Sequence, residues 1–100
     1  MPTNVWKFYV KEGHEDEFVR MNTPGGDWAE LFKRSPDYLG TQVGREIDDR
    51  RVYLVLDKWA TKAAFDDFIE EHAADYAALD ARHKKHYDRD ENIGFFEWGL

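Results

Sequence analysis

The chain has 100 residues, a formal net charge of −7 and no cysteine, and 16% of its residues are Phe, Trp or Tyr. This length suits one domain over residues 1–100 and leaves no room for a separate cofactor domain. The missing cysteine excludes disulfides and thiolate chemistry, and the negative charge disfavours partners such as nucleic acid or an anionic membrane. Because there is no long apolar run and no basic leader, we expect an unexported, cytoplasmic protein.

The first part of the chain predicts a strand and two short helices. Residues 5–10 (VWKFYV) carry apolar side chains on both faces of a predicted β-strand. A short helix is expected over residues 15–21, and a second begins at Asp27, which can form a capping box with Glu30. Between the two helices, residues 24–26 (PGG) form either a lid hinge or a plain connector.

The middle of the chain predicts a β-hairpin. Its first strand covers residues 38–46 and is interrupted by Gly40 and Gly44, which indicate a bulge or a close backbone approach. Residues 48–50 form the turn. The run VYLVL at 52–56 is β-branched and aromatic without polar alternation, a pattern typical of a strand that is covered on both faces.

The last part of the chain predicts two helices and a closing strand. Thr61 is the expected N-cap of a helix that carries Phe65. The helical pattern breaks at His72 and continues over residues 73–86. Residues 91–98 (ENIGFFEW) then predict a fourth strand.

This β-α-β-β-α-β order is typical of an α+β fold, a ferredoxin-like antiparallel sheet with helices on one face. Such a sheet leaves its other face bare. Trp6, Phe8 and Val10 lie on one face of the first strand, and Val5 and Tyr9 lie on the other. Whichever set faces away from the helices would form an apolar patch larger than a soluble monomer normally exposes. We therefore predict a homodimer through the sheet face, with two-fold symmetry.

Short motifs over most of the chain resemble one known family. They are GDWAELF at 26–32, SPDYLGT at 35–41, DKW at 57–59, AF at 64–65 with Phe68, and YAALD at 76–80. These motifs are similar to the antibiotic biosynthesis monooxygenase-like family. The resemblance implies a dimeric α+β barrel with a cavity between sheet and helices in each subunit. It also implies ligands such as flat aromatic polyketides, quinols or haem.

The activity that this resemblance implies is a cofactor-independent oxygenation, with no metal or flavin, in which a phenolic substrate loses a proton and its anion reduces oxygen. Trp59 matches the strand-end tryptophan that lines the pocket of the quinone-forming members. Val55 stands where those members have an asparagine, and Phe65 where they have a tyrosine. The haem-degrading members fit less well, because their first-strand asparagine falls on about Trp6 and their axial histidine near Ala78.

Two side chains are candidate catalytic proton acceptors. Asp57 shares a strand face with Tyr53 and Trp59, and this apolar setting could raise its pKa enough to accept a phenolic proton. The alternative is an ion pair between Asp57 and a nearby lysine or arginine. His72 lies near Tyr76 and could accept a proton near pH 7. A surface or capping histidine is the alternative there.

The expected walls of the substrate site are aromatic: Trp59, Phe65, Tyr53, Tyr76 and Trp28. Trp59 itself allows two interpretations, a wall of the cavity or a plug in the core. His83 and His86 are spaced so that both could hold a divalent metal from one helix face, but no distant partner is evident. We therefore expect no metal site.

Two classes of function remain. The first is a monooxygenase acting on a phenolic or polycyclic aromatic small molecule, which the family resemblance favours. The alternative is a non-catalytic dimer of the same fold that binds a small apolar ligand. The missing polar groups at Val55 and Phe65 favour this alternative.

Overall fold

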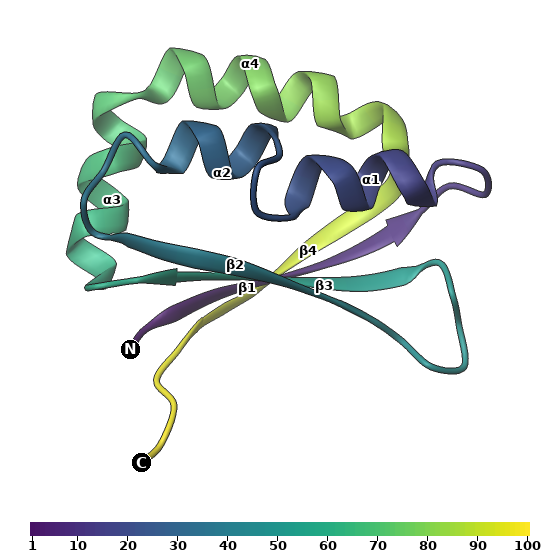
Figure 1. Ribbon diagram of the computed structural model, residues 1–100, viewed down its shortest axis with the longest axis horizontal. Helices are drawn as coiled ribbons and strands as arrows, with labels where there is room; N and C mark the ends of the chain where they lie inside the picture. The colour runs from purple at the N-terminus through teal and green to yellow at the C-terminus, as the bar shows by residue number, and fades with distance from the viewer.

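The computed structural model describes residues 1–100 as a four-stranded antiparallel sheet with its helices on one face (Figure 1). In chain order the elements are β1 (Thr3–Val10), α1 (Glu15–Asn22), α2 (Asp27–Phe32), β2 (Tyr38–Arg45), β3 (Val52–Trp59), α3 (Lys62–Glu71), α4 (Ala73–His83), the short 3-10 helix η1 (Lys84–His86) and β4 (Tyr87–Phe96). The strand order is β2-β3-β1-β4, and neighbouring strands are antiparallel. This is the ferredoxin-like α+β fold that the element order predicts.

The last strand begins earlier than its sequence pattern indicates. β4 starts at Tyr87 rather than at residue 91, and Tyr87 pairs with Val10 while Asp90 pairs with Phe8. The polar run 88–91 has no apolar alternation because β4 is an edge strand and most of its side chains are exposed. The preceding α-helix accordingly ends at His83 and tightens into η1.

Two of the three predicted helix boundaries are confirmed. Thr61 caps α3, since the backbone N–H of Ala64 donates to its hydroxyl at 3.0 Å. His72 separates α3 from α4, as predicted. The predicted capping box at Asp27 is wrong: Gly26 is the N-cap of α2, Asp27 is its first residue, and no side chain caps it.

Gly26 is buried because the chain passes close to the end of α1. A Cβ atom there would lie 2.2 Å from the carbonyl oxygen of Arg20 and 2.7 Å from that of Met21. The turn is closed by the Gly26 N–H, which donates to the Thr23 carbonyl at 2.8 Å. The segment 24–26 is thus a tight turn packed against α1.

The core lies between the sheet and the helices, in two aromatic clusters. One surrounds Phe18 of α1, whose ring lies 5.1 Å from that of Phe8 and 5.2 Å from that of Tyr53. The other surrounds Trp59, which contacts rings of α2 and α3. Because Phe8 and Tyr53 face the helices, strand alternation directs Val5 and Leu54 to the opposite face.

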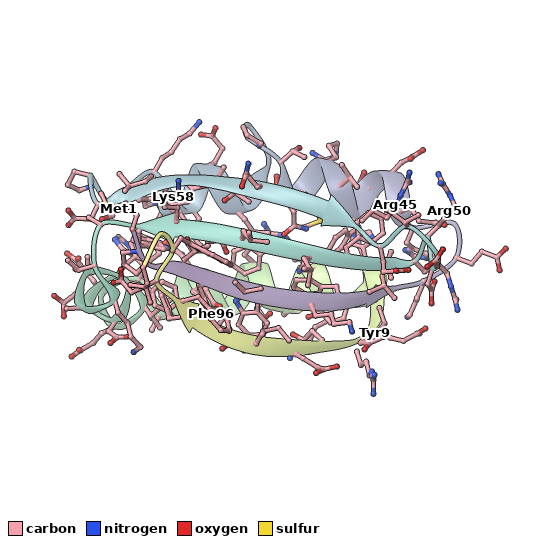
Figure 2. The ribbon with its side chains drawn as sticks, turned by 90° about the horizontal axis from the view of Figure 1, so that it is seen from below. Met1, Tyr9, Arg45, Arg50, Lys58 and Phe96 are labelled. Carbon is pink, nitrogen blue, oxygen red and sulfur yellow. The ribbon has the colours of Figure 1, made fainter.

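No helix covers that opposite face, which Figure 2 shows from below with the strands in front of the helices. Val5 pairs with Leu56, and Leu54 lies 39% exposed beside them on β3. The C-terminal segment passes under one end of this face, where the Trp98 ring packs at a tilt against Phe96 with 6.1 Å between ring centroids. The bare face is therefore partly apolar, and its exposed aromatic side chains lie at the C-terminal end.

Candidate functional site

A small cavity lies between the sheet and the helices. Its volume is about 30 Å³, which is room for about one water molecule and too little for an aromatic ring. The cavity is lined from the sheet by Asn4, Trp6, Phe8, Val55, Asp57 and Asp90, and from the helices by Asn22, Trp28, Phe32, Phe65, Tyr76, Asp80 and His83. It therefore combines aromatic walls with several polar groups.

A larger hollow of about 320 Å³ lies on the surface beside the cavity. Asn4, Trp6, Phe65 and Tyr76 line both spaces, so the inner cavity and the outer hollow adjoin at these four side chains. The Asn92 amide nitrogen donates to the Asn4 side-chain oxygen at 2.8 Å and ties β4 to β1 at this border. A hollow of this size is at the lower end of small-molecule sites.

Asp57 is the buried acid of the cavity, with 6% of its surface exposed. The Thr41 hydroxyl donates to its Oδ1 at 2.6 Å, and the Tyr38 hydroxyl bonds to Thr41 in turn. Since Thr41 gives its one proton to Asp57, Tyr38 must be the donor to Thr41. No lysine or arginine forms an ion pair with Asp57, so the ion-pair interpretation is wrong. Burial raises the pKa of Asp57 to about 6, and the Thr41 hydrogen bond opposes that rise.

A second set of polar atoms on the cavity wall belongs to the buried pair of Asn22 and His83. The Asn22 amide nitrogen donates to the Phe18 carbonyl at 2.8 Å and lies 2.9 Å from His83 Nε2. Burial lowers the pKa of His83 to about 4, so the ring is neutral near pH 7. Because Nε2 accepts from Asn22, the proton of the neutral ring is on Nδ1.

Trp28 and Tyr76 form the helical wall. Their rings pack edge to face at 5.2 Å, and the Trp28 ring lies 5.6 Å from that of His83. The Trp28 indole N–H is buried without a hydrogen-bond partner. Burial raises the pKa of Tyr76 to about 12, so its hydroxyl remains protonated at neutral pH and can act only as a neutral donor or acceptor.

No group of three or more histidine, cysteine, aspartate or glutamate side chains is placed to hold a metal ion. His83 and His86, whose rings are 6.5 Å apart, turn toward different partners. His83 contacts Asn22, whereas His86 contacts His14. None of the helices is long and apolar enough to cross a membrane.

The family model for antibiotic biosynthesis monooxygenases matches residues 1–78. The chain belongs to this family. A search of curated proteins found no match.

Solved structures of the same fold include two of SnoaB, a cofactor-independent oxygenase from Streptomyces nogalater. A SnoaB mutant is 20% identical with a TM-score of 0.79, covering 99% of this chain and 93% of the other. A second SnoaB structure is 23% identical with a TM-score of 0.73 over the same shares of the two chains. A conserved protein from Methanosarcina mazei is 15% identical with a TM-score of 0.70, covering 96% of this chain and 90% of the other. At these identities the likeness shows the fold alone.

Among the site residues expected from the sequence of this family member, four line the cavity: Asp57, Trp28, Phe65 and Tyr76. Three do not. Trp59 is 0% exposed and plugs the core between the rings of α2 and α3. Tyr53 is buried against α1, and the His72 ring packs at a tilt against Phe68 at 4.5 Å where α3 meets α4.

The cavity also contains side chains that sequence reasoning did not select. Asn4 precedes the predicted first strand but shares the alternation of Trp6 and Phe8, which was a usable signal. His83 follows Tyr76 by seven residues on one helix, a spacing that places both on the same face. Asn22 gave no such signal, because it ends a short helix beside a turn.

Proposed function

We propose that this protein is a cofactor-independent monooxygenase acting on a phenolic or polycyclic aromatic small molecule, with Asp57 as proton acceptor. The observation that carries the proposal is a buried carboxylate at the cavity with no cationic partner. Its pKa of about 6 suits proton transfer near neutral pH. Family membership supports the class of reaction.

The proposed reaction begins when Asp57 takes a proton from the substrate. The electron-rich anion then reduces molecular oxygen, one oxygen atom becomes bonded to carbon, and a hydroperoxide forms. Loss of water from this hydroperoxide turns a CH₂ group into a carbonyl, so the substrate supplies the electrons and the second oxygen atom leaves as water. Tyr38 donates to Thr41 and Thr41 donates to Asp57, so this hydrogen-bond chain stabilises the ionised carboxylate that accepts the substrate proton.

Between the two candidate acceptors, geometry favours Asp57 over His72. Asp57 lines the cavity, and His72 lies at a helix junction against Phe68. A general base must reach the proton it abstracts within hydrogen-bond distance. The neutral His83 lies on the cavity wall but already accepts from Asn22 through Nε2, which leaves it a donor.

An aromatic substrate requires the walls to move, since the volume of the inner cavity is only about 30 Å³. We propose that the ligand binds first in the outer hollow of about 320 Å³ and reaches Asp57 when Phe65 and Tyr76 turn aside. Both side chains are only partly buried. Trp28 then supplies an unpartnered N–H at the inner wall, where a substrate oxygen or reduced oxygen could accept it.

We further propose that two copies associate through the bare sheet face, as the family resemblance implies. The exposed apolar side chains Leu54, Phe96 and Trp98 support this arrangement. Burial of such a face is favourable at roughly 25 cal/mol per Å² of apolar surface.

The second candidate is a non-catalytic protein that binds a small apolar molecule. The small cavity volume of about 30 Å³ favours it. So does the absence of a hydrogen-bonding group at Val55 and at Phe65, two positions on the cavity wall.

The test is oxygen uptake by metal-stripped protein with a panel of anthrones, hydroquinones and flavonols. We expect uptake with at least one anthrone or hydroquinone, falling about a hundredfold or more in Asp57→Asn. Asp67→Asn, on the exposed side of α3, is the matched control, and His72→Gln tests the competing acceptor. Binding without uptake would establish the non-catalytic protein. Undiminished uptake in Asp57→Asn would refute the assigned acceptor.

A further inference from the structure

We propose that the imidazoles of His14 and His86 form a bidentate site for a divalent transition metal ion of the class that prefers nitrogen ligands, such as Cu²⁺ or Zn²⁺. Their Nδ1 atoms lie 3.0 Å apart. Neither residue lines the cavity, so the site is separate from the proposed oxygenase chemistry. It lies where the start of α1 meets η1, between residues that are 72 positions apart in the chain.

The separation of the two nitrogens matches that of a chelate. Ligands at 2.0–2.1 Å from a tetrahedral ion are roughly 3.3 Å apart, and ligands at a right angle around a square-planar ion are roughly 2.9 Å apart. The observed 3.0 Å between His14 and His86 lies between these values. A metal ion between the two Nδ1 atoms therefore needs only a small change in their separation.

The protons on the His14 and His86 rings leave room for a metal ion between them. Two Nδ1 atoms at hydrogen-bond distance share one proton, so one is the donor and the other offers its lone pair. When a metal ion accepts a lone pair from each Nδ1, the shared proton moves to the free Nε2 of the ring that held it, and both neutral rings then carry their proton on Nε2.

The backbone already holds both histidines in place through one residue, Lys11. The His14 N–H donates to the Lys11 carbonyl at 3.0 Å, and the Lys11 N–H donates to the His86 carbonyl at 3.0 Å. The His14 carbonyl also accepts from the Phe18 N–H at 2.9 Å in the first turn of α1. Because the ligands are pre-ordered, metal binding has little conformational entropy to overcome.

Charged side chains near His86 act both against and in favour of a bound cation. Lys85 and Arg20 act on His86 as positive charges and oppose a cation, whereas Glu17 acts as a negative charge. Glu17 now pairs with Arg20 at 2.5 Å on the exposed face of α1. Water would complete the coordination of an ion held by two imidazoles, which favours Cu²⁺, the strongest binder in the divalent series.

The experiment is calorimetric titration of the metal-stripped protein with Cu²⁺ and with Zn²⁺, together with the electron paramagnetic resonance spectrum of the Cu²⁺ form. We expect one ion per chain, micromolar affinity for Cu²⁺, and hyperfine coupling to two imidazole nitrogens. His14→Gln should weaken binding about tenfold or more, and His72→Gln is the matched control that keeps full affinity. His14 is partly exposed, so this variant does not disturb the core.

A thermal melt supplies the second measurement. Zn²⁺ should raise the melting temperature of the wild-type protein and of His72→Gln, and should not raise that of His14→Gln or His86→Gln. Absence of Cu²⁺ binding at 100-fold molar excess would leave a plain hydrogen-bonded histidine pair and overturn the proposal. Equal affinity in His14→Gln would overturn it as well, because the ion would then lie elsewhere.

Discussion

Replacing Asp57 by asparagine should stabilise the protein above pH 6. Burial raises the pKa of this carboxyl from 3.8 to about 6 in the folded protein. Between these two pH values the native state binds more protons at Asp57 than the unfolded chain does. The free energy of unfolding therefore falls as the pH rises through this range, and it is lowest above about pH 6. A rise of about two pKa units corresponds to roughly 3 kcal/mol. Asparagine carries no charge, and its Oδ1 can still accept from Thr41.

The measurement is urea unfolding of wild type and Asp57→Asn at pH 4, 6 and 8. The two proteins should be of similar stability near pH 4, and the variant should be more stable by up to roughly 3 kcal/mol at pH 8. With urea slopes of about 1–3 kcal/mol per M, this difference moves the midpoint by roughly 1 M or more. Asp67→Asn is the control, because its side chain is exposed on α3.

Two results would refute this reasoning. If Asp57→Asn were destabilised equally at every pH, its side chain would matter through packing or hydrogen bonding and not through the cost of a buried charge. If the difference between the proteins did not grow between pH 4 and pH 8, the carboxyl would not have a raised pKa in the folded state.

Three further changes test other features. Thr41→Val removes the hydrogen bond that restrains the pKa of Asp57, so the carboxyl should titrate at higher pH by ¹³C NMR, whereas Thr41→Ser should not change it. Gly26→Ala should cost about 2 kcal/mol or more in urea unfolding, because its Cβ would meet backbone oxygen, whereas Gly44→Ala, with open space around its Cβ, should change stability by less than about 1 kcal/mol. Leu54→Asp should give single chains by light scattering, and a wild-type mass of one chain at micromolar concentration would contradict the proposed dimer.

The sheet and helices could be predicted because local patterns agree with their environment. The apolar run 52–56 belongs to a strand next to the centre of the sheet, and Thr61 caps the helix that follows it. The predicted start of β4, at residue 91, is wrong for the opposite reason. Its residues 88–91 face solvent on an edge strand, so pairing with β1 determines their structure and their polar pattern carries no strand signal.

Which residues line the cavity could be predicted only in part. Alternation along a strand shows which face a side chain lies on, but not which part of that face meets the cavity. Tyr53, Val55, Asp57 and Trp59 share one face of β3. α1 packs on Tyr53 at one end of that face, and α3 packs on Trp59 at the other. Only Val55 and Asp57, in the middle, line the cavity.

Partners from distant segments were beyond sequence reasoning. Thr41 reaches Asp57 because the register of β2 on β3 places them opposite one another. The spacing of three residues places His86 beside His83, but the fold turns His86 toward His14 near the start of the chain. Neither contact has a local sequence pattern, since each depends on how separate elements meet.

Two polar groups on the wall of the cavity are best considered together. Asp57 is a buried carboxylate that lowers stability above about pH 6, and Trp28 has a buried N–H with no acceptor, both on the wall of one cavity. A protein selected for stability alone would be improved by an apolar or amide side chain at position 57. A carboxylate that can accept a proton and an N–H that can donate to an oxygen atom are the two groups that the proposed oxygenation would use. Retaining both at a cost in stability is easier to explain by a ligand that satisfies them than by packing.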